Sequence, residues 1–181
     1  MLKLKDIIVP FTSEGSYQVD VGLMYLENTL RDYTEDFGLE LNPDFQRGAV
    51  WTEAQQIAFV EYFLRRGTSS MIIYFNCGLF GGRSSERGVD DFCKKIVCVD
   101  GLQRLTALRK FIANELPVFG HYLNEFEDAR VILRGSSIKF NVNNLKTRKE
   151  VLKWYLDLNT GGTVHSDEEI NRVKELLALE S

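Results

Sequence analysis

Apolar residues follow two different periods along the chain, and the sharpest change from one to the other falls within residues 95–111. Residues 96–99 form a continuous apolar run, which predicts a buried strand. After Asp100-Gly101 the apolar residues recur at helical spacing, so a helix is expected from near Gly101 to about residue 112. This strand, turn and helix form the element around which we interpret the rest of the chain.

Helical spacing also predicts four further helices. The first is expected to begin with an N-cap at Asp20 and to stop at Gly38. Capping boxes, in which Ser or Thr is followed three residues later by Glu or Gln, predict the starts of the others at Thr52, Thr147 and Ser166.

Shorter apolar runs predict strands. Residues 1–9 are expected to form a short strand or lead-in, and residues 71–76 a further strand. Residues 129–133 and 137–141 are interpreted as a hairpin. Between the strands at 71–76 and 95–99, residues 77–94 contain four glycines and predict a mobile loop or the flap of a hairpin, which we expect to act as a lid. Strands and helices are mixed in order, which favours an α+β fold in a single domain.

Composition narrows the functional class. The 181 residues are 44% hydrophobic and carry a net charge of −4, so the chain can form a core but has no overall positive field for nucleic acid. Three cysteines without C-x-x-C spacing argue against a disulfide framework and a zinc knuckle, and Cys98 is expected to be buried. The chain shows no signal peptide or long apolar run, so we expect a cytoplasmic protein without a membrane partner.

The turn at Asp100-Gly101 has the features of an anion site. Backbone N–H groups at the start of a helix attract anions, and Arg binds phosphate or carboxylate through two hydrogen bonds. Arg104 and Gln103 both lie in the first expected helical turn. Two simpler explanations stay open: Asp100 and Gln103 also match a capping box, and Arg104 could be a structural ion-pair partner.

A second candidate ligand lies in residues 41–51, which have no regular period. Gln46-Arg47 is flanked by Phe45 and Trp51, whose large apolar side chains are expected to hold the loop against the core. A loop held in this way positions an Arg better for binding than a free loop does.

Three motifs together resemble the DGQQR-motif domain at the N-terminus of GmrSD-type restriction enzymes, within the ParB/sulfiredoxin-like superfamily. They are residues 43–51 (PDFQRGAVW), residues 99–106 (VDGLQRLT) and residues 158–166 (LNTGGTVHS). The resemblance covers about residues 20–175. It implies a small mixed sheet flanked by helices, and nucleoside-triphosphate binding or hydrolysis near the Asp-Gly-x-Gln-Arg turn.

On this resemblance, each motif residue acquires an expected role. Asp100 and Gln103 would be catalytic: the carboxylate would hold Mg²⁺ or orient water, and the amide would position the nucleophile. Phosphate-binding candidates come from all three motifs: Gln46, Arg47, Gly101, Arg104, Thr106, Asn159, Gly161, Gly162 and His165. The last four also fit a helix end followed by a helix start, an interpretation that stays open.

Leu102 departs from the family pattern, which commonly has Gln there, so nucleotide binding is better supported than hydrolysis. The leading hypothesis is a Mg²⁺-dependent NTPase of a phage or bacterial DNA-conflict or DNA-metabolism system. One alternative is a non-catalytic module that binds nucleic acid or protein through the basic pairs at 65–66, 94–95 and 109–110. A second alternative is a ParB-like nuclease. DNA or a separate nuclease subunit is a candidate partner, because we expect these residues not to include the nuclease domain that larger family members carry.

Overall fold

The computed structural model describes residues 3, 7–8, 17–46, 50–69, 71–80, 88–160 and 167–180. Within them four strands form one mixed sheet: β1 (Tyr17–Gly22), β2 (Ile72–Asn76), β3 (Val97–Asp100) and β4 (Ser137–Asn143). The strand order is β1-β4-β2-β3. β4 pairs antiparallel with β1 and parallel with β2, and β2 pairs antiparallel with β3. The expected α+β class with a small mixed sheet is confirmed.

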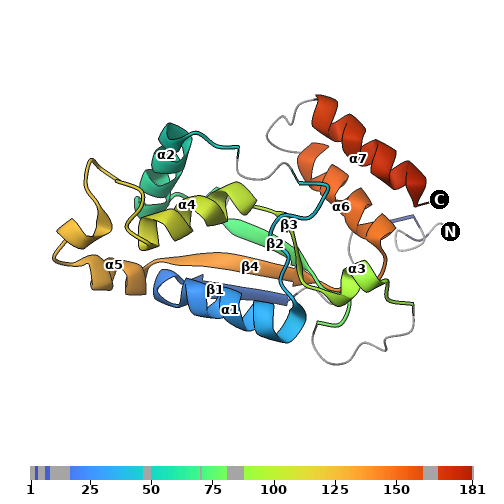
Figure 1. Cartoon of the computed structure of the whole chain (residues 1–181), viewed down its shortest axis with the longest axis horizontal. Helices are drawn as coiled ribbons and strands as arrows, with labels where there is room; N and C mark the ends of the chain where they lie inside the picture. Colours follow the sequence, from blue (N-terminus) through green and yellow to red (C-terminus); the bar gives the residue numbers. More distant parts are fainter. Residues whose placement is uncertain are drawn as a thin grey trace.

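Seven α-helices lie within the described residues (Figure 1). They are α1 (Leu26–Phe37), α2 (Glu53–Leu64), α3 (Asp91–Lys94), α4 (Leu102–Ile112), α5 (Ala129–Gly135), α6 (Arg148–Thr160) and α7 (Asp167–Leu179). None of the helices in this described part of the chain has the length and apolar character to cross a membrane.

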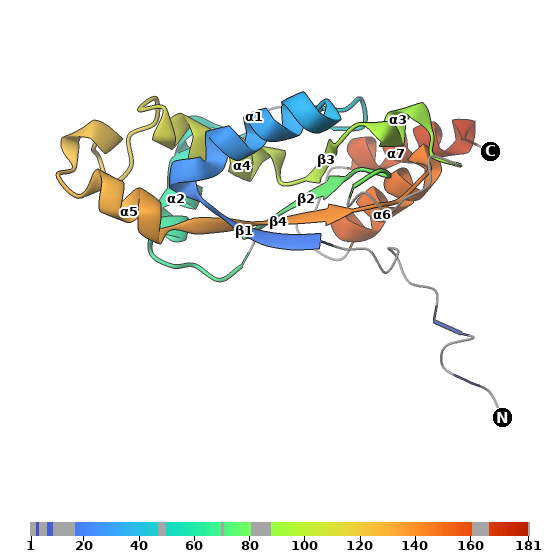
Figure 2. The same cartoon turned by 90° about the horizontal axis from the view of Figure 1, so that it is seen from below.

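The helices cover the sheet unequally. Figure 2 shows α1 and α4 on one side of it, and their apolar faces, together with that of α2, pack on residues such as Ile73, Phe75 and Phe140. On the other side, Val97 and Val99 pack against α6 and α7. Since side chains alternate along a strand, β3 contributes to both cores and joins them. The polar residues on this second side of β1 and β4 include Asp20 and Lys139, which form an ion pair.

Two predicted capping boxes are confirmed. Thr52 and Gln55 exchange both hydrogen bonds at the start of α2. At the start of α6, the Thr147 N–H donates to Glu150, and the Glu150 N–H donates to the Thr147 hydroxyl. The third predicted box, at Ser166, lies outside the described residues. Gly38 ends α1 in the left-handed conformation, as expected.

The N-cap predicted at Asp20 is wrong. Asp20 lies within β1 and pairs with Lys139 of β4, and a 3-10 turn separates the strand from α1. The apolar alternation of Tyr17, Val19 and Val21 was the sequence signal for this strand.

The predicted hairpin at residues 129–141 is also wrong in its first arm, which forms α5. β4 already has a strand on each side, because β1 and β2 occupy both of its edges. Residues 129–133 therefore have no strand to pair with, and the N–H groups of Val131 and Ile132 donate to the Asp128 carbonyl in a helical turn instead.

The expected loop at 77–94 contains the four-residue helix α3 and joins the antiparallel strands β2 and β3. Its glycine-rich centre, residues 81–87, lies outside the described residues, so the predicted lid stays a prediction. The same holds for most of the lead-in at 1–9.

Candidate functional site

The predicted strand–turn–helix is present at β3 and α4. β3 is buried along Val97–Val99 and ends at Asp100, and α4 begins at Leu102. Gly101 joins them with a φ of +103°, a conformation that favours glycine. A Cβ at this position would lie 2.7 Å from Ile73 Cδ1 and 3.2 Å from Ile73 Cα. The absent side chain thus allows the start of α4 to lie directly on β2.

The capping box predicted for Asp100 and Gln103 is wrong. Gly101 is the N-cap of α4, and no side chain caps the helix start. The Oε1 atom of Gln103 instead accepts hydrogen bonds from the backbone N–H groups of Val50, at 2.9 Å, and Trp51, at 3.1 Å. Gln103 therefore holds the approach to α2 against the first turn of α4.

The Asp100 carboxylate pairs with Arg104, one turn further along α4. The Arg104 side chain is 13% exposed and that of Asp100 is 30% exposed, so solvent screens this ion pair less than a surface pair. The structural ion pair considered from the sequence is therefore present. It does not exclude ligand binding, because a guanidinium can exchange one anionic partner for another.

Arg104 also lines a hollow of about 310 Å³ on the second side of the sheet. Lys139 lines the same hollow, and its ammonium contacts Asp20 Oδ1 at 3.0 Å. Thr68 and Tyr74 also line it. Two cations thus converge on one small space, each with an aspartate beside it.

Sequence reasoning missed Lys139, Asp20, Thr68 and Tyr74. Their convergence depends on the sheet register, in which Asp20 lies opposite Lys139 and Tyr74 lies opposite Asp100. The sequence did hold one signal for this polar site. Lys139 and Asn141 occupy alternate positions of the predicted strand, which indicates that one face of the strand is polar.

The expected packing of residues 41–51 against the core is confirmed at Phe45 and at Trp51, which lie before and after the centre of this segment. Phe45 is buried, with its ring centroid 5.1 Å from that of Tyr155, and Trp51 packs on Phe59 at 5.6 Å. The Gln46 amide donates to the Cys98 carbonyl at 2.8 Å. Arg47 itself lies outside the described residues, so its phosphate-binding role stays a prediction.

The structure separates Thr106 from the Arg104 hollow. The Thr106 hydroxyl donates to the Leu102 carbonyl at 2.8 Å, and the residue lines a different hollow with Glu27 and Arg109. Asn159 is buried in the last turn of α6, where its amide donates to the Tyr155 carbonyl at 2.6 Å. Gly161, Gly162 and His165 lie outside the described residues.

The cysteine beside the turn is not a candidate nucleophile. Cys98 is fully buried in β3, and burial, together with the nearby Asp100 charge, raises the pKa of its thiol. All three cysteines are free and buried, which agrees with the sequence argument against a disulfide framework. Among the described residues, no group of three or more His, Cys, Asp or Glu side chains is arranged to hold a metal ion.

The fold and the turn define a small α+β domain with an Asp-Gly-x-Gln-Arg turn between a buried strand and a helix. The sequence model of the GmrSD restriction endonuclease N-terminal domain matches residues 26–137, more than half of the chain, so the protein belongs to this family. The match includes the β3–α4 turn and residues 46–47, but not the motif at residues 158–166. Neither the curated proteins nor the solved structures contain a match.

Proposed function

We propose that this domain binds a nucleoside triphosphate at the β3–α4 turn and hydrolyses it as part of a DNA restriction system. Family membership supports the restriction setting. The observation that carries the nucleotide proposal is the convergence of Arg104 and Lys139 on one hollow beside the Gly101 turn. Two cations and a helix start are a suitable environment for a polyanion such as a triphosphate.

Binding would exchange the partners of these cations. Phosphate oxygens would replace the Asp100 carboxylate at the Arg104 guanidinium and the Asp20 carboxylate at Lys139. Such an exchange costs less than creating a new charged contact, because a cation that is already partly desolvated loses little further hydration.

The released Asp100 carboxylate fits Mg²⁺, which prefers hard oxygen ligands. Mg²⁺ commonly binds through one or two carboxylates, water and substrate phosphates, so a single protein ligand is sufficient. When bound, the ion would neutralise charge on the phosphates. Gln103 is proposed to orient the attacking water, which would require its Oε1 to release one of its two backbone donors.

The binding-module alternative has weaker support, because its basic pairs lie on separate elements and none of them lines the Arg104 hollow, and two of their cations have acidic partners of their own. Lys94 pairs with Asp91 at 2.7 Å, and Arg109 pairs with Glu27 at 2.6 Å. Neither Lys94 nor Arg109 lies in the Arg104 hollow.

Titration calorimetry with each NTP and Mg²⁺ tests the proposal on wild type, Arg104→Ala and Arg104→Lys. Loss of a charge-assisted hydrogen bond worth about 1.5–3 kcal/mol should weaken binding roughly tenfold to a hundredfold in the Ala variant. Lys should restore only part of the affinity, because it lacks the planar two-donor geometry. Arg109→Ala is the matched control, since Arg109 lies on the same helix in a different ion pair, and it should bind like wild type.

Activity assays then separate the three functional classes. Phosphate release from NTP supports the proposal, and Asp100→Asn should abolish it. Nicking of plasmid DNA without phosphate release would indicate a nuclease. If wild type neither binds NTP nor releases phosphate, the nucleotide proposal is wrong and the binding module replaces it.

A further inference from the structure

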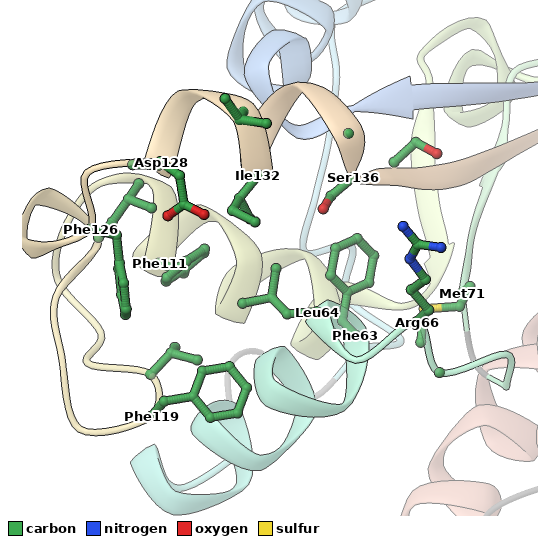
Figure 3. Close-up of a pocket in the computed structure, with 17 residues that line it drawn as sticks. Phe63, Leu64, Arg66, Met71, Phe111, Phe119, Phe126, Asp128, Ile132 and Ser136 are labelled. Carbon is green, nitrogen blue, oxygen red and sulfur yellow. The ribbon is translucent and has the colours of Figure 1, made fainter.

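A second and larger cavity lies at the end of the molecule that carries α5. Its volume is about 730 Å³, within the usual range for small-molecule sites. Figure 3 shows Phe63 and Leu64 of α2, Phe111 of α4 and Ile132 of α5 around it, with Phe119 and Phe126 from the connecting segment. We call this cavity the aromatic pocket. Phenylalanine rings on several sides of the cavity suit a flat aromatic ligand, which can stack against them.

The aromatic pocket carries opposite charges at its two ends. Figure 3 shows the Asp128 carboxylate directed toward Phe111 and Ile132 at one end, and Arg66 beside Met71 at the other. Neither of these two charged side chains forms a hydrogen bond or ion pair within the described part of the chain, and Asp128 makes no side-chain cap to α5. The pocket therefore offers an acceptor, an apolar middle and a cation, in that order.

The wall of the aromatic pocket is held in place by specific contacts. The Arg65 guanidinium lies 5.0 Å from the centroid of the Phe119 ring, and the Phe119 N–H donates to Glu61 Oε1 at 2.9 Å. Phe119 and Arg66 both adopt positive φ, at 54° and 61°. Strained non-glycine residues of this kind are common at ligand sites, where the surrounding structure maintains them.

The aromatic pocket adjoins the Arg104 hollow. Met71 and Ser137 line both spaces, and Gly67 in the pocket wall precedes Thr68 in the wall of the hollow. Arg66 thus lies at the end nearer the two cations of the hollow, while Asp128 lies at the far end. A ligand with an anionic tail and an aromatic head would match this order of charges.

We propose that the aromatic pocket holds the base of the nucleotide and that Asp128 selects guanine. This inference rests on the proposed nucleotide function. The phosphates would lie at Arg104 and Lys139, and the base would stack among the phenylalanine rings. A carboxylate has two acceptor oxygens and no donor. Guanine presents two adjacent donors, its N1–H and its 2-amino group, which satisfy both oxygens. Adenine presents a donor beside the N1 lone pair, so one oxygen would face another acceptor.

Binding of GTP, ATP and inorganic tripolyphosphate to the full chain tests this inference. Wild type should bind GTP roughly tenfold or more tightly than ATP, the size expected for a two-bond base contact. Asp128→Asn should bring the two affinities within a factor of about two to three, because an amide offers one donor and one acceptor. Asn is an equally good helix N-cap, so α5 should keep its fold.

Two further variants control for charge and stacking. Glu127→Gln removes a neighbouring exposed carboxylate that does not line the aromatic pocket, and it should keep the wild-type GTP preference. Phe126→Leu keeps the wall apolar but removes one ring. This variant should bind GTP and ATP several-fold more weakly than wild type, because base stacking contributes to the binding of each nucleotide alike. Its affinity for tripolyphosphate should be unchanged.

The outcomes distinguish this inference from the function on which it rests. If GTP and tripolyphosphate bind and depend on Arg104, but Asp128→Asn keeps the wild-type ratio of GTP to ATP, the base site is wrong and the nucleotide function stands. A wild-type preference for ATP, or none between the two, overturns the guanine assignment in the same way. If neither nucleotides nor tripolyphosphate bind wild type, both proposals fail together.

Discussion

Substitution of Gly101 by Ala measures how tightly the β3–α4 turn is built. The left-handed region costs an L-residue about 1–2 kcal/mol, and Gly101 has a φ of +103°. The new methyl would also lie 2.7 Å from Ile73 Cδ1 and 3.2 Å from Ile73 Cα. The first of these atoms can move by a rotamer change, but the second belongs to the backbone of β2.

Overpacking of this kind typically costs about 1–3 kcal/mol. Reduced freedom of the unfolded chain offsets about 0.4–1 kcal/mol of the total. The free energy of unfolding should therefore fall by about 2–4 kcal/mol. Urea denaturation followed by circular dichroism gives this value from the shift in midpoint at constant slope.

Two other glycines separate the contributions. Gly120→Ala combines a φ of +80° with open space around the position, so it should lose about 1 kcal/mol from backbone conformation alone. Gly135→Ala, at the end of α5, meets no atom within 4 Å and has an ordinary φ, so it should gain roughly 0.5 kcal/mol. If Gly101→Ala loses no more stability than Gly120→Ala, the close approach to Ile73 does not constrain the turn, and our explanation of this glycine is wrong.

Two predictions concern buried groups. Thiol reagents at pH 8 should leave all three cysteines of the native protein unmodified and label all three in urea, because burial raises the pKa of Cys93 to about 12 and also raises those of the other two. Rapid native labelling would contradict their burial. The free energy of unfolding should be lower at pH 10 than at pH 8, because Cys93 and Tyr33, both with a folded pKa of about 12, ionise more readily when unfolded. Denaturation at pH 8 and pH 10 measures this difference, and equal stabilities would refute it.

The elements that sequence reasoning predicted well are those with local signals. α2 has a capping box at Thr52, a helical apolar period and Gly67 just beyond its end. β3 and α4 have an abrupt change of period at a single glycine. Each of these features is encoded within a short window, so no distant contact was needed to predict it.

The elements that were missed depend on partners far away in the chain. β1 exists as a strand because it pairs with β4, which lies more than a hundred residues later. α5 has the β-branched composition of a strand, but both edges of β4 are occupied. Composition alone cannot report which edges of a sheet are free, and tertiary context overrides it.

The residues of the candidate site also divide into those that a local motif identified and those that depend on distant parts of the chain. The motif identified Asp100, Gly101 and Arg104, which the structure brings together at one turn. It did not identify Lys139, because the position of that side chain follows from strand order. It also included Thr106, which lies near Arg104 in sequence but lines a different hollow. Arg104 and Thr106 are two residues apart on a helix, so their side chains point to nearly opposite faces of it.

The Asp100–Arg104 pair offers a test that separates a structural ion pair from a ligand-binding one. Both side chains are less than one-third exposed. The ion pair should therefore contribute more to the free energy of unfolding than the roughly 0.2–1 kcal/mol that is typical of surface pairs. We expect a coupling of about 1–2 kcal/mol from a double-mutant cycle of Asp100→Ala and Arg104→Ala, measured as unfolding free energies without ligand. Each single variant should therefore be destabilised.

The same cycle measured with saturating nucleotide gives the decisive comparison. If phosphate replaces Asp100 at the Arg104 guanidinium, the energetic link between the two residues is lost in the bound state. The coupling should then fall toward zero while the nucleotide stabilises wild type by mass action. If wild type is stabilised but the coupling stays at its ligand-free value, Arg104 remains paired with Asp100 in the complex. Arg104 would then be structural, and Lys139 would become the leading candidate for the phosphate contact, because it is the other cation in the wall of the same hollow.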